Sequence, residues 1–200
     1  MPPLNIPAWR SIGRYFVIGL TPLMVTITLN DNLMEINSIQ GESMIPSLSP
    51  EYGETGRRDY VAWKKWQPLE NLQRGDVVMF MNPKRPDAVT VKRIIGLEGD
   101  TVLLDTRRRP HESHDAQGWD VWMGRARVPY GHVWVEGDNW RGSLDSNHYG
   151  PISQSLIIGR AVDIVWPWGR AGTTPWEGFK VKTRVIPGPT KMSVPPEWAD

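Results

Sequence analysis

Ser43 lies in residues 41–46 (GESMIP), where a turn is expected to expose its hydroxyl group. Gly41 allows the backbone to approach a substrate closely, and Pro46 stiffens the exit from the turn. Amide groups near Ser43 could then point into one space and form an oxyanion hole. A serine beside a glycine is more often an ordinary turn residue. The segment therefore predicts a nucleophile only if a general base lies close to it.

Histidine is the base that serine nucleophiles use most often. His111 and His114 lie in a polar loop with no third metal ligand nearby, which favours a solvated role. His132 follows a glycine at the expected start of a strand, and His148 is close in sequence to Asp145. A Ser–His–Asp arrangement stays open on these residues alone.

Lys92, in the expected strand 89–97 (VTVKRIIGL), is the alternative base. A lysine acts as a base only when it is neutral, and full burial lowers its pKa by as much as about 3–5 units. Strand alternation places Lys92 on the face of Thr90 and Ile94, and Arg93 on the opposite face. Arg93 cannot be the base because its guanidinium does not deprotonate in proteins. A half-exposed lysine in a surface ion pair is the competing interpretation, and spacing does not decide between the two.

A third candidate segment is residues 137–150 (GDNWRGSLDSNHYG), a polar loop between two strongly predicted strands. Such loops usually only reverse the chain. Its many short hydroxyl and carboxylate side chains also make it suited to hold a neighbouring amine in one orientation.

The element that precedes these segments is an uncharged, mostly apolar run at residues 15–29, preceded by Arg10 and Arg14. A helix of this run covers about 22 Å, whereas a hydrocarbon core is about 30 Å thick, so a span needs flanking residues as well. We expect a membrane anchor over about residues 12–34, with its N-terminal end on the cytoplasm-like side. A cleavable secretory signal is disfavoured because no small-x-small cleavage site follows the run. A buried helix of a soluble domain is disfavoured because Pro22 would kink it.

Short β-branched segments bounded by Gly, Pro, Asn or Asp follow the apolar run, as is typical of strands. They are residues 36–40, 60–63, 76–81, 89–97, 101–104, 132–136 and 156–166. The pattern predicts a mainly β protein made of packed antiparallel sheets or a partly open barrel. Residues 107–118 read as a surface loop, and the proline-rich residues 173–200 as a tail that either wraps the domain or stays disordered.

Composition limits the classes of function. The formal net charge is only +1, whereas proteins that bind nucleic acid are usually strongly basic. The chain has no cysteine, so a disulfide framework, a Cys-ligated zinc, an Fe–S cluster and a thiol nucleophile are excluded. It contains 11 tryptophans, a residue type that suits both cores and membrane interfaces.

Four blocks, in this order after one N-terminal anchor, resemble the type I signal peptidases, a family of Ser/Lys dyad endopeptidases. Residues 41–46 are similar to the family motif S-M-x-P, and residues 74–80 (RGDVVMF) to R-G-D-x-V-x-F. Residues 92–100 (KRIIGLEGD) are similar to K-R-I-x-G-x-x-G-D, and residues 137–150 to the closing G-D-N…S-x-D-S block. The resemblance covers about residues 36–167.

The resemblance implies a role for each matched residue. Ser43 is the nucleophile and its amide donates to the oxyanion, and Lys92 is the general base. Ser143 orients the Lys92 amine, and Asp145 braces the closing loop. Gly41 stands where some relatives have a second serine in the oxyanion hole, so that donor is missing here or is supplied by the backbone. No metal or cofactor is implied.

Two departures point to one branch of the family. Glu98 stands where bacterial members commonly have proline, and Asn147 stands where many members pair an arginine with the aspartate. With the Trp166-Pro167 exit and the proline-rich C-terminus, these features look like the mitochondrial inner membrane proteases, in particular their subunit 2. That resemblance implies a single-pass protein of the mitochondrial inner membrane, a catalytic domain in the intermembrane space, and a heterodimer with a homologous subunit 1.

The sequence therefore predicts an anchor segment at residues 1–35, a peptidase domain at 36–170 and a C-terminal tail at 171–200. The expected activity is removal of sorting or signal peptides after small residues, through an acyl-enzyme. The alternatives are a bacterial-type signal peptidase, subunit 1 of the same protease, and a non-catalytic tethered subunit that stabilises a partner. A Lys92 amine far from the Ser43 hydroxyl would favour the last of these.

Overall fold

The computed structural model describes residues 32–105, 121–122 and 124–188. The expected anchor at about residues 12–34 lies almost entirely outside this part of the chain. Among the helices of the described residues, none has the length and the apolar character needed to cross a bilayer.

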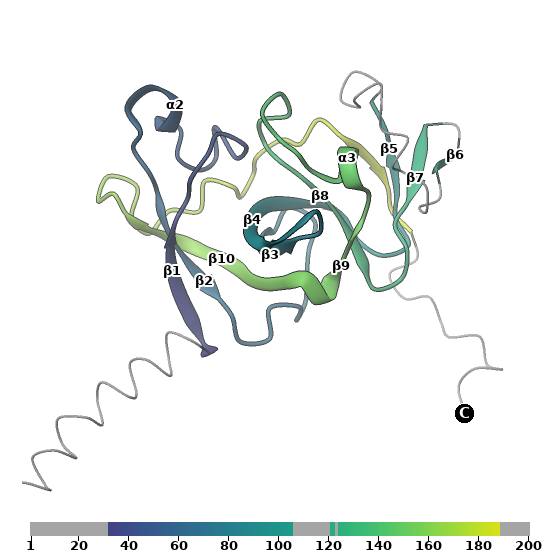
Figure 1. Ribbon diagram of the computed structural model, residues 1–200, viewed down its shortest axis with the longest axis horizontal. Coiled ribbons are helices and arrows are strands. Elements are labelled where there is room, and N and C mark those ends of the chain that lie inside the picture. The colour runs from purple at the N-terminus through teal and green to yellow at the C-terminus, as the bar shows by residue number, and fades with distance from the viewer. Residues whose placement is uncertain (1–31, 106–120, 123, 189–200) are drawn as a thin grey trace, which may run out of the picture.

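A seven-stranded antiparallel sheet forms the centre of the fold (Figure 1). Its spatial order is β1 (Met34–Ser38), β2 (Tyr60–Lys64), β10 (Ile157–Trp166), β3 (Val77–Asn82), β4 (Arg85–Gly96), β8 (His132–Glu136) and β9 (Ile152–Ser153). Strands β1 and β9 are the two edges of the sheet, so the sheet is open and does not close into a barrel. The predicted mainly β, antiparallel architecture is confirmed.

A second, four-stranded sheet packs beside the first. Its order is β11 (Arg184–Ile186), β5 (Thr101–Leu103), β7 (Arg125–Arg127) and β6 (Val121–Trp122). Three short helical segments complete the described elements: α2 (Tyr52–Thr55), α3 (Ser146–Tyr149) and η2 (Gln154–Leu156). In Figure 1, β3 and β4 lie between the β1–β2 pair on one side and the second sheet on the other.

Every segment expected to be a strand overlaps one, and the ends differ by at most four residues. The structure adds β6, β7, β9 and β11, each of two or three residues. Runs this short are too short to show an alternating pattern in the sequence. They are strands because they pair with neighbouring strands, and not because of their own residues. The described part of the expected C-terminal tail, up to residue 188, packs on the domain: it supplies β11, and Trp176 is only 5% exposed.

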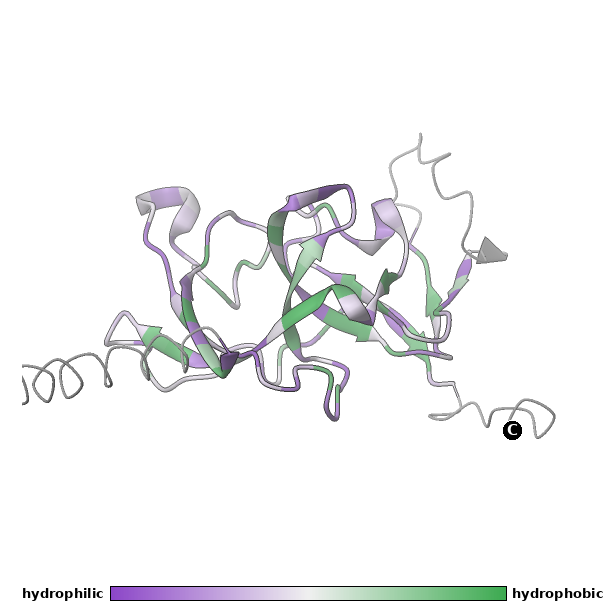
Figure 2. Ribbon diagram, turned by 60° about the horizontal axis from the view of Figure 1, so that its bottom comes forward, coloured by the Kyte–Doolittle hydropathy of each residue, from purple (hydrophilic) through white to green (hydrophobic). Residues whose placement is uncertain are grey.

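Hydrophobic residues concentrate on the strands, and hydrophilic residues on many of the connections between them (Figure 2). Residues 77–80 of β3 are buried, and the two faces of the strand pack into different apolar clusters. Its odd-numbered residues join a cluster with Trp63 and Ile164, and its even-numbered residues join a cluster with Ile94 and Val133. A third cluster around Trp134 joins the two sheets. The second half of β4, from Lys92 to Gly96, therefore lies in a largely apolar interior, whereas its first residues are exposed.

Candidate active site

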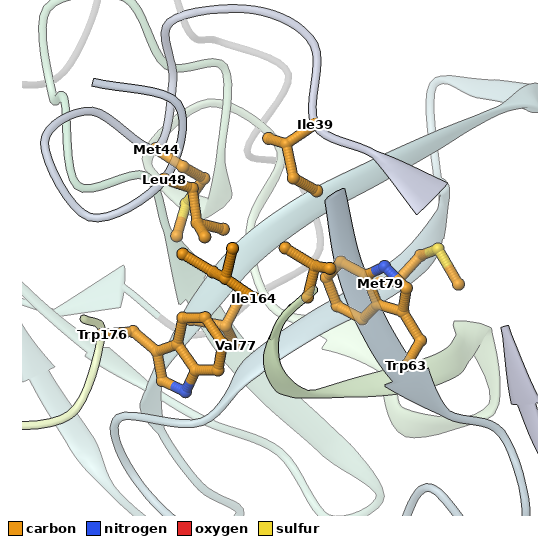
Figure 3. Packing of buried hydrophobic residues seen from close by; sticks show 9 residues of the cluster. Ile39, Met44, Leu48, Trp63, Val77, Met79, Ile164 and Trp176 are labelled. Carbon is orange, nitrogen blue, oxygen red and sulfur yellow. The ribbon is translucent and has the colours of Figure 1, made fainter. Parts of the chain in front are cut away.

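The turn that carries Ser43 leaves β1 and is held by apolar residues on either side of the serine. Ile39 before it and Met44 and Leu48 after it are at most 5% exposed and belong to one core cluster (Figure 3). Ser43 itself is only partly buried. The apolar residues therefore fix the turn while leaving the hydroxyl accessible.

Gly41 has a φ of +88°, a conformation that L side chains rarely adopt. A Cβ added at Gly41 would meet no atom within 4 Å, so the requirement for glycine comes from the backbone and not from crowding. Within the described residues, the amide of Ser43 donates to no protein acceptor. That amide is thus available to a substrate oxygen.

Lys92 lies opposite Val78 of β3 and is only 3% exposed. Its Nζ is 2.7 Å from the Oγ of Ser43 and 3.1 Å from the carbonyl oxygen of Val91. The structure thus brings together two residues that are 49 positions apart in the sequence. A neutral amine at this distance accepts the hydroxyl proton of Ser43 directly.

Burial lowers the pKa of Lys92 from 10.5 to about 8, because the charged ammonium loses its solvation. The carboxylates of Asp145 and Asp138 act in the opposite direction and raise it, but they do not outweigh burial. A substantial fraction of the amine is therefore neutral near pH 8, which is the state that a general base needs.

The loop after β8 holds the backbone of the nucleophile turn. The amide of Asn139 donates to the carbonyl of Ser43 at 3.0 Å, and its side chain donates to the carbonyl of Glu42 at 3.1 Å. Gly137 lies so close that an added Cβ would be 2.5 Å from the Ser43 carbonyl oxygen and 2.4 Å from the Oγ of Ser143. Only glycine fits at position 137 without displacing these neighbours.

Ser143 and Asp145 are buried beside this contact. The Ser143 hydroxyl donates to Asp145 Oδ2 at 2.7 Å, and the Gly137 amide donates to the same oxygen at 3.0 Å. Among the described residues, the hydrogen bonds of the Lys92 amine go to Ser43 and Val91, and none joins it to Ser143. The structure thus brings Ser143 to the site, and its expected role in orienting the amine stays a prediction.

Asn147 supplies the donors that an arginine would otherwise provide. Its backbone amide and its Nδ2 both donate to Asp145 Oδ1 at 3.1 Å, the first of these capping α3. Burial alone would raise the pKa of Asp145, but the nearby His148 ring and the hydrogen bonds from Gly137, Ser143 and Asn147 hold it below its usual range. Asp145 is thus a buried carboxylate that accepts hydrogen bonds from Gly137, Ser143 and Asn147, and position 147 provides an amide and no arginine for an ion pair.

The two histidines in the described part of the chain contact groups other than Ser43. His132 Nδ1 contacts the carbonyl of Tyr130, and His148 Nδ1 is 3.8 Å from Asp145 Oδ1. In the described residues neither ring bonds to the Ser43 hydroxyl, whose partner is Lys92. His111 and His114 fall outside the described residues.

Arg93 and Asp138 form a positioning pair to which the sequence reasoning gave no role. Arg93 is 1% exposed, and its Nε and Nη2 each donate to Asp138 at 2.7 Å. Its Nη2 also donates to Ser47, four residues after the nucleophile. The K-R and G-D-N motifs contained both partners, but a separation of 45 positions in the sequence hid the pairing.

A pocket of about 560 Å³ opens beside the dyad, between β1 and the first half of β4. Ser43, Lys92, Trp63 and Met79 are among its lining residues. A larger cavity of about 760 Å³ lies on the Arg93 side and contains neither member of the dyad. Its arginines are engaged with carboxylates or backbone carbonyls, so the smaller pocket is the one next to reactive groups.

The sequence of this chain is similar to those of known proteins over most of its length. Residues 12–166 match the family model described as signal peptidase, peptidase S26. The chain is 39% identical to mitochondrial inner membrane protease subunit 2 of Saccharomyces cerevisiae, over 80% of this chain and 84% of that protein. It is also 39% identical to subunit 2 of Danio rerio, over 80% of each chain. Its identity to subunit 1 of S. cerevisiae is 32%, over 79% of this chain and 80% of that protein.

The family model covers well over half of the chain, and the relatives align over most of their length. Their similarity spans the nucleophile turn, the lysine strand and the closing loop together. The chain therefore belongs to the signal peptidase family S26 and is a serine endopeptidase.

Proposed function

We propose that this chain is a membrane-bound serine endopeptidase that removes sorting or signal peptides from proteins delivered to the mitochondrial intermembrane space. The observation that supports this most is the 2.7 Å contact between the buried Lys92 amine and the Ser43 hydroxyl. It favours an active enzyme over a non-catalytic tethered subunit, because an inactive subunit has no need to bury a lysine against a serine.

In the proposed reaction, the neutral Lys92 amine takes the Ser43 proton while Ser43 Oγ attacks the scissile carbonyl carbon. The Ser43 amide, in the turn shaped by Gly41, donates to the oxyanion. The Lys92 ammonium then gives its proton to the leaving amine, which leaves an acyl-enzyme. A water molecule, deprotonated by Lys92, hydrolyses the ester and returns Ser43 to its starting state.

Ser143 and Asp145 have positioning roles in this proposal. Through Gly137, the Ser143–Asp145 pair packs against the Ser43 carbonyl, so it keeps the nucleophile turn at a fixed distance from β4. Asp145 also favours the ammonium form that follows proton transfer, since its charge raises the pKa of Lys92.

The proposed location and partner come from the relatives. The proteins at 39% identity are named as mitochondrial inner membrane proteases, and the family includes a subunit 1 and a subunit 2. We propose a single-pass anchor at about residues 12–34, a catalytic domain in the intermembrane space, and a heterodimer with a homologous subunit 1. Shared attachment to the membrane raises the effective concentration of a substrate that is cleaved next to an apolar segment.

The test compares full-length wild type, Ser43→Ala and Lys92→Met in membranes, with and without the homologous subunit, on a presequence substrate. Both variants should lose at least about a thousandfold in cleavage rate, because nucleophile and base are each removed. Unchanged thermal unfolding of both variants is the control for folding. Cleavage at the wild-type rate by Lys92→Met would eliminate the dyad, and loss of cleavage on replacing His148 alone would favour a histidine base instead.

A further inference from the structure

Strand β1 has an inverted pattern of polar and apolar residues. Met34 and Ile36 point outward and are 47% and 54% exposed, whereas Glu35 and Asn37 are partly buried and line the pocket beside the dyad. In register, Glu35 lies opposite the fully buried Trp63. A strand of this kind normally turns its apolar residues inward, and such an exception tends to mark a functional site.

The contacts of Glu35 and Asn37 fix the orientation of the Asn37 amide. Its Nδ2 donates to Glu35 Oε1 at 2.8 Å, and the other oxygen of Glu35 is 2.9 Å from Lys65 Nζ. Lys65 and Asn37 keep the pKa of Glu35 below its usual range, against the effect of burial. Because the nitrogen of the amide must face this carboxylate, Oδ1 is the remaining group of Asn37 and it can only accept hydrogen bonds.

Trp63 forms part of the same pocket wall. It is 0% exposed, and its Nε1 is buried with no hydrogen-bond partner among the described residues. Because this N–H has almost no accessible surface, Glu35 and Asn37 are the polar groups that this end of the pocket presents to a substrate.

We propose that Asn37 is a specificity-determining residue, and that the pocket end formed by Glu35 and Asn37 binds a short uncharged polar side chain of the substrate. This inference rests on the proposed function. The side chain donates to Asn37 Oδ1, as serine, threonine or asparagine can. A hydrocarbon side chain leaves the acceptor unpaired, and an acidic side chain meets the Glu35 carboxylate.

The position of the pocket also limits which substrate residue enters it. The pocket extends from Ser43 along β1 to Glu35, and an extended chain advances about 3.3 Å per residue. The side chain at its far end therefore belongs to a residue at least two positions from the scissile bond, and not to the residue that is acylated.

The experiment measures kcat/KM of the full-length enzyme on presequence substrates that differ at one position only. Threonine, valine, aspartate and lysine are placed in turn at each of the four positions on either side of the scissile bond. At one position, at least two residues from that bond, wild type should cleave the threonine substrate about tenfold faster than the valine isostere, as expected for one net hydrogen bond. Aspartate should be the poorest residue there.

Asn37→Leu should reduce that threonine-to-valine ratio to about one. The ratio of two rates on one sample does not depend on the folded fraction, so partial unfolding cannot imitate this result. Asn37→Asp should make lysine the preferred residue at that position, because a second carboxylate then stands beside Glu35. Ile36→Thr, on the exposed face of the same strand, is the matched control and should keep the wild-type ratio.

A ratio near one at every position in wild type would overturn the inference, as would an unchanged ratio in Asn37→Leu. Failure of the proposed function gives a different result, since then wild type cleaves none of the substrates or Ser43→Ala cleaves them equally well.

Discussion

Lys92 and Arg93 are neighbours on β4, equally buried, and the fold treats their charges in opposite ways. Arg93 is 1% exposed and has Asp138 on two of its nitrogens, with the carbonyls of Gly75 and Trp176 on a third. Lys92 is 3% exposed, and among the described residues no carboxylate bonds to its amine. The buried half of the strand thus carries one basic residue with a contacting carboxylate and one without.

The difference shows that burial turns a lysine into a general base only where no carboxylate contacts its amine. A contacting carboxylate would offset the desolvation of Lys92 and keep it protonated, whereas Arg93 has such a carboxylate, Asp138, as its counter-charge. Asp138 and Asp145 act on Lys92 only through space, and burial outweighs them. The Arg93 side therefore provides rigidity, and the Lys92 side provides a proton acceptor.

The largest expected effect is on stability, when the ion pair between Arg93 and Asp138 is removed. Arg93→Met leaves the Asp138 carboxylate, whose side chain is 2% exposed, without its partner, which should cost about 3–5 kcal/mol of unfolding free energy. Lys92→Met removes an amine that is already poorly solvated, so it should cost far less. Urea unfolding of both variants measures the difference. Similar losses in the two variants would contradict the comparison, and Arg93→Met combined with Asp138→Leu should regain much of the stability.

The next largest effect is on kcat, from a substitution on the Lys92 side of the loop after β8. Gly137→Ala places a Cβ against the Ser43 carbonyl and Ser143, so kcat should fall about a hundredfold as the nucleophile is displaced. Gly169→Ala is the control, because a Cβ there meets no atom within 4 Å. Single-turnover cleavage, below the unfolding temperature of both proteins, gives the rates. Equal rates for the two variants would show that the close packing at Gly137 has no bearing on catalysis.

The smallest effect is a shift in pH dependence. Because only the neutral amine acts as a base, kcat/KM should rise with pH through a midpoint near 8, where the pKa of Lys92 lies. Asp145 raises that pKa, so Asp145→Asn should move the midpoint to lower pH. A profile measured from pH 5 to 10 on both proteins tests the sign. A shift to higher pH would mean that Asp145 does not act on Lys92 through its charge.

The sequence predicted the long strands well because their own residues specify them. Strand β3 is a run of buried apolar residues, and residues 132–136 were predicted with the bounds that β8 has. Strand β11 and the burial of Trp176 depend on the rest of the fold, so a proline-rich composition suggested only a tail.

The site was predictable in its residue types but not in its contacts. Strand alternation put Lys92 and Arg93 on opposite faces, and their partners do lie apart. Spacing could not show that Ser143 donates to Asp145, or that Glu35 and Asn37 turn inward, because an alternating pattern alone places the apolar residues of β1 in the core. Whether Ser143 orients the lysine stays a prediction.

The C-terminal segment carries a consequence for biosynthesis. Buried charged groups receive partners from it: Arg93 donates to the Trp176 carbonyl, Glu136 accepts from Thr183, and Asp100 accepts from the amide of Gly188. These partners are translated after the strands they complete. A nascent chain that has emerged only as far as β10 therefore lacks them, and the peptidase domain cannot complete these contacts until Gly188 has been synthesised.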